Sequence, residues 1–506
     1  MASKHVPKPS WTGGPPLSSQ APPYAQFSPS PSSPESRSSS PPPFLLPLRL
    51  PFTRSYLRKR RTPLPAVLAG LTILTLSVLL FLVMSRRCEP VQVVQQVGVR
   101  QGVDDRFATR NWVRGPPKPR FADNLKPDVK YISTFVSSGW TANDVMTYGN
   151  LLYLSLLTQR VPVLGPFVPS HLSSTAGYIP FSDVFDIAHL AKSMNAPVLE
   201  WGDLKSVEEG VEEELGCWSA WMATSREIKD PRWSWIPGVF GLDISYTPLP
   251  YDHKMFPEQD NEPHLKYGKL MQLSFPSERA RALSLSSPRG TKSGNPLLPS
   301  DHLLCFDQMY AISLEQQWEW FVDSSPVWRF VGRHMRWNKN AEALAKNYLA
   351  KHWGVPQGGL LPPYISVHAR RGDFTAHCQW MHQTGSSCLP SLTQLQRRVS
   401  EVSEKLALKG VHTDRVLVTS DEKDETWWAG VGQLGYTWVD HKALRTDELY
   451  GEWYSPLLDA IFHSLAAGFV GTDQSTMSLL AARRVEEWND GPVGFLLWQG
   501  VPEGEL

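Results

Sequence analysis

The chain has 506 residues, of which 41% are hydrophobic and 20% are charged, and its formal net charge is +1. This balance lacks the basic surplus that marks nucleic-acid-binding proteins, so we expect no nucleic-acid partner. A chain of this length also exceeds what one hydrophobic core usually organises, which predicts more than one folded unit.

Residues 1–65 form a Pro- and Ser-rich segment that ends in a basic flank. The segment nearly lacks aliphatic residues before Phe44, so it cannot bury enough apolar surface to offset the entropy of ordering the chain. We therefore predict a disordered tail.

An uncharged, proline-free stretch follows from Ala66 to Ser85, with the sequence AVLAGLTILTLSVLLFLVMS. As a helix, about 20 residues extend about 30 Å, which is the hydrocarbon thickness of a bilayer. A buried core helix is the weaker alternative because basic residues abut both ends. A cleaved signal peptide would begin earlier and have a shorter apolar run. The sequence therefore predicts one transmembrane helix at residues 66–85.

Basic residues are unevenly distributed around this stretch, and the flank with more Lys and Arg stays in the cytoplasm. Six such residues precede the stretch and three follow it: Arg49, Arg54, Arg58, Lys59, Arg60 and Arg61 before, and Arg86, Arg87 and Arg100 after. We therefore predict a single-pass type II protein of the Golgi or endoplasmic reticulum membrane, with the large folded domain in the lumen.

Residues 86–129 contain several prolines and no clear hydrophobic period, which predicts a stem. Beyond them strands and helices alternate, as is typical of parallel sheets with helices on both faces. We predict an α/β fold of two Rossmann-like lobes, residues 130–355 with irregular insertions and residues 356–506. The pattern predicts strands at 131–137, 161–166, 364–370, 415–421, 436–440 and 468–472, and helices at 141–159, between 370 and 415, at 453–467 and from 475 onward.

Five cysteines are present, and an oxidising lumen would favour disulfides between them. Cys378 and Cys388 bracket a short polar segment and are the preferred bridge. Cys217 with Cys305 is a guess for a second bridge, and Cys88 is free, acylated or intermolecular. No CxxC or HExxH motif occurs, so we expect no zinc site.

The sharpest chemical feature is VHARRGDF, residues 367–374, at the end of a predicted strand. Ligands of open α/β sheets bind at the carboxyl ends of the strands. Two adjacent arginines there, Arg370 and Arg371, match the oxygens of a diphosphate, because guanidinium forms paired hydrogen bonds with phosphate. The alternative is a salt-bridge cluster with Asp373 and a neighbouring carboxylate.

A second feature is FVGTDQSTMSLL, residues 469–480, in which a strand leads into a helix at Ser475 or Thr476. Hydroxyl and free N–H groups at a helix N-terminus can bind an anion, although an ordinary N-cap is the alternative. A third feature, SSGWTAND at residues 137–144, is a strand-to-helix turn with Gly139 and Asn143 at the bend.

Together with SDE at residues 420–422, these motifs resemble those of the GDP-fucose-dependent protein O-fucosyltransferases and their α1,6-fucosyltransferase relatives. The resemblance covers residues 130 to 490 and is strongest at 368–373. It implies a GT-B-like fold, in which the second lobe binds GDP-fucose as donor substrate and the acceptor is a protein or a glycan hydroxyl. It also implies inversion at the anomeric carbon and no required metal or other cofactor.

The resemblance implies catalytic roles for Arg370, which would grip the β-phosphate, and for Asn143, which would lie near the fucose and the phosphates. Six positions match the donor-binding residues of the family: His368, Arg370, Arg371, Asp373, Ser475 and Thr476. Trp140 and Thr141 stand where some members carry a catalytic glutamate, so the general base stays open, with Asp144 and Glu200 as candidates. A transferase for another nucleotide sugar and a non-catalytic nucleotide- or glycan-binding membrane protein are the alternative functions.

Overall fold

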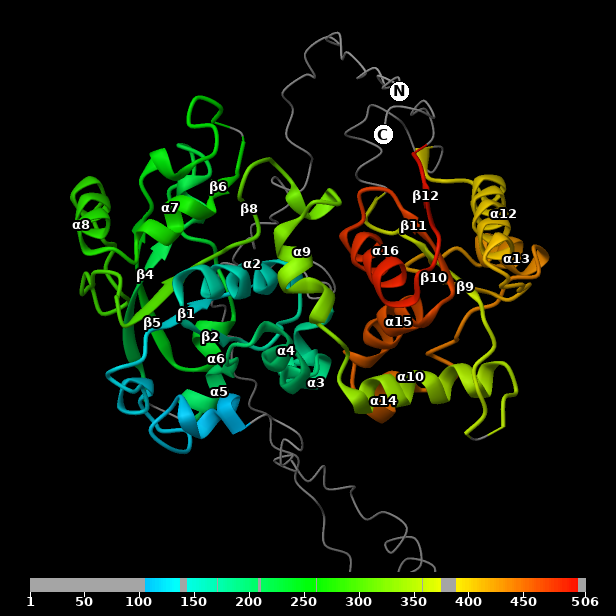
Figure 1. The fold of residues 1–506 in the computed structure, drawn as a ribbon, viewed down its shortest axis with the longest axis horizontal. Helices are drawn as coiled ribbons and strands as arrows, with labels where there is room; N and C mark the ends of the chain where they lie inside the picture. Colours follow the sequence, from blue (N-terminus) through cyan, green and yellow to red (C-terminus); the bar gives the residue numbers. More distant parts are fainter. Residues whose placement is uncertain are drawn as a thin grey trace, which may run out of the picture. The chain divides into compact units, whose positions relative to one another are not determined.

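The computed structural model describes residues 105–136, 143–170, 172–207, 211–260, 262–356, 358–374 and 388–498. Two parallel β-sheets with flanking helices organise these residues (Figure 1), which confirms the predicted mixed α/β class. The predicted tail and the stretch at 66–85 lie outside the described residues. Within the described ranges, no helix is both long and apolar enough to cross a bilayer.

The first sheet has six strands in the order β3-β2-β1-β7-β4-β5, and all of its pairings are parallel. Its strands are β1 (Tyr131–Thr134), β2 (Val161–Leu164), β3 (Leu199–Glu200), β4 (Glu213–Ser219), β5 (Leu242–Pro248) and β7 (Leu303–Phe306). The short strands β6 (Leu265–Lys266) and β8 (Ile312–Ser313) form a separate parallel pair. Strands β1, β2 and β7 are buried along their whole length, as parallel strands covered on both faces must be.

Helices connect and cover these strands. They are α2 (Asn143–Thr158), α3 (Phe181–Val184), α4 (Ile187–Met194), α5 (Trp201–Leu204), α6 (Ile236–Val239), α7 (Tyr267–Gln272), α8 (Pro276–Leu285), α9 (Pro326–Phe330) and α10 (Lys339–His352). The first, α2, buries residues on all sides because it packs against β1, β2, α7 and α9. Its N-terminus follows the carboxyl end of β1 in the chain, and residues 137–142 between the two lie outside the described residues.

Residues 105–125, which are part of the predicted stem, pack onto the first sheet. Phe107, Val113 and Phe121 are buried in its core. The carboxylate of Glu213 in β4 accepts the backbone N–H groups of Phe121 at 2.7 Å and Ala122 at 3.2 Å. This part of the predicted stem is therefore held to the folded domain by apolar burial and by charge-assisted hydrogen bonds.

A disulfide between Cys217 and Cys305 joins β4 to β7, with a Cα–Cα distance of 4.8 Å. This pairing confirms the guess made from the sequence. Cys388 also takes part in a disulfide, and its partner lies outside the described residues. The Cys378–Cys388 bridge therefore stays a prediction.

The second sheet has four parallel strands in the order β10-β9-β11-β12. Its strands are β9 (Ile365–Ala369), β10 (Val416–Ser420), β11 (Gly468–Thr472) and β12 (Val493–Leu496), and its helices are α12 (Leu392–Leu408), α13 (Glu425–Gln433), α14 (Thr446–Tyr450), α15 (Tyr454–Leu465) and α16 (Thr476–Asn489). Val470 of β11 packs with apolar side chains of α12, whereas Phe469 packs with those of α16. The alternation places these two helices on opposite faces of the sheet (Figure 1).

Two features of this sheet differ from the sequence prediction. Residues 436–440 are not a strand, because only Thr437 forms a bridge, to Leu417, and Trp438 then packs against Trp428. The edge strand β12 was not expected. In the register of the sheet, Ala369 lies opposite Ser420, so β9 and β10 end at the same edge.

Candidate active site

The turn after β9 carries both arginines of VHARRGDF at the carboxyl edge of the four-stranded sheet. Asp421, the residue after β10, holds this turn, because its Oδ1 accepts the N–H groups of Arg371 at 2.8 Å and Gly372 at 2.9 Å. A Cβ atom at position 372 would lie 2.8 Å from Asp421 Oδ2, so any residue larger than glycine would displace this carboxylate. The neighbouring strand therefore determines how the arginine turn is shaped.

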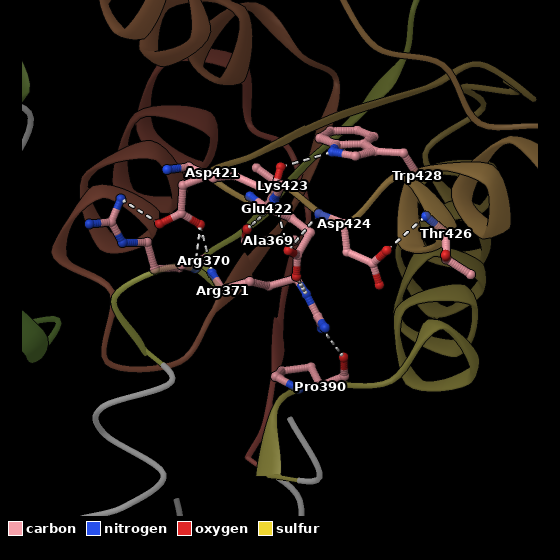
Figure 2. A network of polar contacts seen from close by, with 12 residues as sticks. Ala369, Arg370, Arg371, Pro390, Asp421, Glu422, Lys423, Asp424, Thr426 and Trp428 are labelled. Carbon is pink, nitrogen blue, oxygen red and sulfur yellow. Dashed lines mark hydrogen bonds and ion pairs between the residues drawn. The ribbon is translucent and has the colours of Figure 1, made fainter. Parts of the chain in front are cut away.

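Arg370 places its guanidinium between two carboxylates. Its Nη1 lies 3.2 Å from Asp421 Oδ2 (Figure 2), and its Nη2 donates to Asp373 Oδ2 at 2.8 Å. The side chain is 24% exposed, so it can be reached from solvent. The salt-bridge cluster considered from the sequence is therefore present. Arg370 is also exposed enough for a phosphate ligand to reach it.

Arg371 is directed into the protein. Its Nε donates to Glu422 Oε2 at 2.6 Å and its Nη1 to the Pro390 carbonyl at 3.0 Å (Figure 2), and its guanidinium lies 5.1 Å from the centre of the Trp427 ring. Burial acts to raise the pKa of Glu422, but the hydrogen bonds from Arg371 and from backbone N–H groups outweigh it and lower that pKa. The contacts of Arg371 are those of a residue that fastens the β9 turn to the segment after β10.

His368 is buried beneath this turn at the end of β9. Its Nδ1 lies 2.8 Å from Ser478 Oγ, and Ser478 Oγ also accepts the backbone N–H of Thr472 at 2.9 Å. The hydroxyl of Thr472 donates to the His368 carbonyl and accepts the backbone N–H of Arg370, each at 2.9 Å. Burial, with the nearby charge of Arg370, lowers the pKa of His368 to about 3, so the imidazole is neutral.

The two motifs of the second lobe therefore meet at one place. Thr472 ends β11, and Ser475 then caps α16 by accepting the N–H of Ser478 at 3.4 Å. Within the described ranges, the N–H groups of Thr476 and Met477 have no hydrogen-bond acceptor, as expected for the first turn of a helix. Ser475 and Thr476 thus lie at the N-terminus of α16, where a bound anion is favoured. Thr472, just before this helix, is hydrogen-bonded to the backbone of Arg370.

Three further predicted residues lie on elements of the first lobe, two at the start of α2 and one at the end of β3. Asn143 is the first residue of α2, and its carbonyl accepts the Thr147 hydroxyl at 2.8 Å. Asp144 beside it is fully buried, and its charge acts to raise the pKa of Arg232 against the lowering effect of burial. Glu200 caps the N-terminus of α5, and its carboxylate accepts the Ser182 N–H at 3.1 Å. Both candidate bases thus already interact with protein groups.

Sequence reasoning missed several polar residues at the strand ends. Thr472 and Asp421 lie within the motifs quoted from the sequence, but their bonds to the arginine turn depend on the strand order. Asp307 follows β7, which was not predicted, and it accepts the hydroxyl of Ser219 at 2.5 Å and the N–H groups of Ala220 at 2.8 Å and Arg232 at 2.9 Å. Burial raises its pKa to about 6. Among the described residues, no three His, Cys, Asp or Glu side chains form a metal-binding group.

Solved structures of three other proteins are similar to this chain at low sequence identity. The solved structure of POFUT1 in complex with GDP-fucose is 17% identical, with a TM-score of 0.46, and the match covers 74% of this chain and 99% of that one. NodZ from Bradyrhizobium, a fucosyltransferase, is 14% identical, with a TM-score of 0.32, over 70% of this chain and 92% of that one. A mutant of Arabidopsis thaliana FUT1 in complex with GDP is 11% identical, with a TM-score of 0.34, and the match covers 75% of this chain and 72% of that one.

A search of the curated proteins finds no match. The comparison with protein families matches residues 145–487, more than half of the 506-residue chain, to the family described as GDP-fucose protein O-fucosyltransferase. The matched segment contains most of α2, the strands from β2 to β11, the arginine turn and nearly all of α16. The chain therefore belongs to the GDP-fucose protein O-fucosyltransferase family.

Proposed function

We propose that this protein transfers fucose from GDP-fucose to a hydroxyl group of a protein or glycan acceptor, with inversion at the anomeric carbon. Membership of the family supports the donor and the reaction class. The observation that carries the site assignment is the hydrogen bond from the Arg370 N–H to Thr472 Oγ1, 2.9 Å long. It joins the partly exposed arginine that follows β9 to the segment that leads into the N-terminus of α16.

The donor's diphosphate is the group that this pairing suits. The guanidinium of Arg370 would bind phosphate oxygens with two hydrogen bonds, and the free N–H groups at the start of α16 would add donors and a favourable helix dipole. The hydroxyls of Ser475 and Thr476 lie at the same helix end. Arg371 would act from behind by holding the turn, and neutral His368 would hold the strand end or contact the nucleotide.

The proposed reaction requires a site that stabilises the departing diphosphate. The bond between the fucose anomeric carbon and the β-phosphate oxygen breaks, and negative charge grows on that oxygen. Preorganised cations and N–H groups lower the barrier by interacting more strongly with this charge than with the ground state. The acceptor hydroxyl attacks from the opposite face, which inverts the centre, and its proton passes to a base, for which Asp144 and Glu200 remain the candidates. Asn143, at the N-terminus of α2, would orient the fucose and phosphates.

We also propose that the protein works as a single-pass type II enzyme of the Golgi or endoplasmic reticulum membrane. The apolar stretch at residues 66–85 and the excess of basic residues before it support this arrangement. The disulfide between Cys217 and Cys305 agrees with a lumenal domain, because such bonds persist in oxidising compartments.

The site assignment is tested by replacing Arg370 in the full-length protein. We expect Arg370→Ala to lower the turnover of GDP-fucose by about a hundredfold or more, because one charge-stabilising donor is lost. Arg370→Lys keeps the charge but cannot form the two-pronged contact, so it should not restore turnover. The measurements are transfer or donor hydrolysis, and GDP affinity by calorimetry.

Arg415→Ala is the matched control, because Arg415 lies just before β10 at the opposite edge of the same sheet and contacts the exposed Asp414. It should leave turnover unchanged. A folded Arg370→Ala protein with near-normal transfer would contradict the site assignment. Turnover of another nucleotide sugar in a donor panel would favour the first alternative, and GDP binding without any turnover would favour a non-catalytic protein.

A further inference from the structure

The carboxylate of Asp421 is the one group that contacts both the backbone and the guanidinium of the arginine turn among the described residues. Its Oδ1 accepts the N–H groups of Arg371 and Gly372, at 2.8 and 2.9 Å. Its Oδ2 lies 3.2 Å from Arg370 Nη1 (Figure 2). One carboxylate thus holds both the backbone after β9 and the guanidinium of Arg370.

Other hydrogen bonds hold the backbone on both sides of the arginine turn. Asp421 follows β10 directly, and Ser420 before it pairs with Ala369 in the sheet and donates its hydroxyl to the Ala369 carbonyl at 2.6 Å. On the other side of β9, Thr472 Oγ1 accepts the N–H of Arg370. The residue that carries the guanidinium is therefore fixed from both neighbouring strands, β10 and β11.

From this geometry we propose that Asp421 is a positioning residue, which aims the Arg370 guanidinium at the donor's diphosphate; the inference rests on the proposed function. Asp421 does not itself have to touch the donor. As an anion it would repel a diphosphate, so its benefit must come from orientation. A fixed orientation removes the cost of ordering the arginine when the ligand binds.

Asp373 contacts the same guanidinium but differs from Asp421 in its position in the chain, its exposure and the nitrogen that it contacts. It lies three residues after Arg370 on the same turn, its side chain is 51% exposed against 28% for Asp421, and it meets Nη2 at 2.8 Å. An exposed pair of this kind is held weakly. We therefore expect a diphosphate to displace Asp373 from Arg370 and to leave Asp421 in place.

The inference is tested by measuring GDP binding to the full-length chain, with variants of Asp421 and a control variant at Asp414. Asp421→Ala removes the acceptor of two N–H groups and should weaken GDP binding by about 10- to 100-fold. Asp421→Asn keeps one carbonyl oxygen for the two N–H groups and should weaken binding less. Asp414→Asn is the matched control and should leave GDP affinity unchanged, because the Asp414 side chain is 96% exposed and lies just before β10, at the opposite edge of the sheet, 3.8 Å from Arg415.

A double-mutant cycle separates positioning from a general structural role. If Asp421 acts through Arg370, then adding Asp421→Asn or Asp421→Ala to Arg370→Ala should cause no further loss of GDP affinity. Thermal unfolding checks that each variant is folded, and the asparagine variant keeps the test valid if the alanine variant does not fold. Additive losses, or Asp421 variants that bind GDP as wild type does, would overturn the inference. Failure of the folded wild type to bind GDP would instead overturn the proposed function.

Discussion

Two buried histidines lie behind the arginine turn and are kept neutral by their surroundings. His463 is enclosed by the hydroxyls of Ser366, 2.7 Å from Nδ1, and Thr419, 3.0 Å from Nε2, and its ring centre is 5.4 Å from that of His368. Burial lowers the pKa of both residues to about 3, with their mutual proximity adding to the effect at His463. Protonation of either imidazole therefore opposes the folding of this region.

This arrangement predicts that stability falls in acid. Between pH 6.5 and 3 the histidine binds a proton in the unfolded chain, where its pKa is near 6.5, but not in the folded protein. The free energy of unfolding therefore falls as the pH drops from 6.5 toward 3. The loss should be about 2 kcal/mol per histidine between pH 6.5 and 5. His463→Gln is neutral at every pH and should show a shallower fall by about that amount in urea unfolding at several pH values.

The comparison with wild type is needed because Asp307 works in the opposite direction. Its folded pKa is raised to about 6, so it destabilises the folded state as the pH rises through 6, and acid relieves this effect. That contribution is common to both proteins and cancels in the difference. Equal slopes for wild type and His463→Gln would show that His463 is not held neutral.

The adjacent arginines of the turn show which side-chain orientations a sequence cannot predict. The pair Arg370 and Arg371 was predicted from the need for anions at a strand end, and anions do meet both side chains. Which arginine is directed outward could not be predicted, because it depends on Glu422 and Trp427, more than 50 positions along the chain. Only the pairing of β9 with β10 brings those partners to Arg371.

Among the elements, strand β4 illustrates why part of the first sheet was missed. Its sequence, EELGCWS, begins with two acidic residues and contains a glycine, which are poor strand signals. Glu213 is nevertheless buried there because it accepts N–H groups from Phe121 and Ala122, a contact between segments 92 residues apart. By contrast, β9, β10 and β11 were predicted correctly, since buried parallel strands read as continuous apolar runs.

The disulfide that joins β4 to β7 should be a major contribution to stability. It connects cysteines 88 positions apart, for which the chain-entropy model gives about 4–5 kcal/mol. Replacing both Cys217 and Cys305 by alanine should lower the free energy of unfolding by about 2–5 kcal/mol in urea titrations. The double variant is more specific than reduction, which would also break the disulfide of Cys388. An unchanged unfolding midpoint would mean that the bridge adds nothing.

On the scale of the whole molecule, the folded part begins earlier than composition suggested. Residues 105–125 lack a helical or strand period and contain prolines, so they read as a linker, yet Asn124 is fully buried. Its side-chain amide donates to the carbonyls of Pro116, Asp203 and Leu204, at 3.0 to 3.2 Å. Irregular chain can be packed when side chains satisfy its backbone groups, and no local pattern reveals this. A soluble fragment beginning at residue 130 would lack these contacts.

The membrane arrangement is a prediction for the entire chain, and it depends on residues before 105. The six basic residues before the apolar stretch exceed the three after it, so the N-terminal side should stay in the cytoplasm. In sealed microsomes, added protease should therefore shorten the protein only by its tail. Replacing Arg58, Lys59, Arg60 and Arg61 by asparagine leaves two basic residues before the stretch against three after it, and should produce a mixture of orientations. Digestion of the large domain of the wild type in intact microsomes would reverse the topology and place the Arg370 site in the cytoplasm.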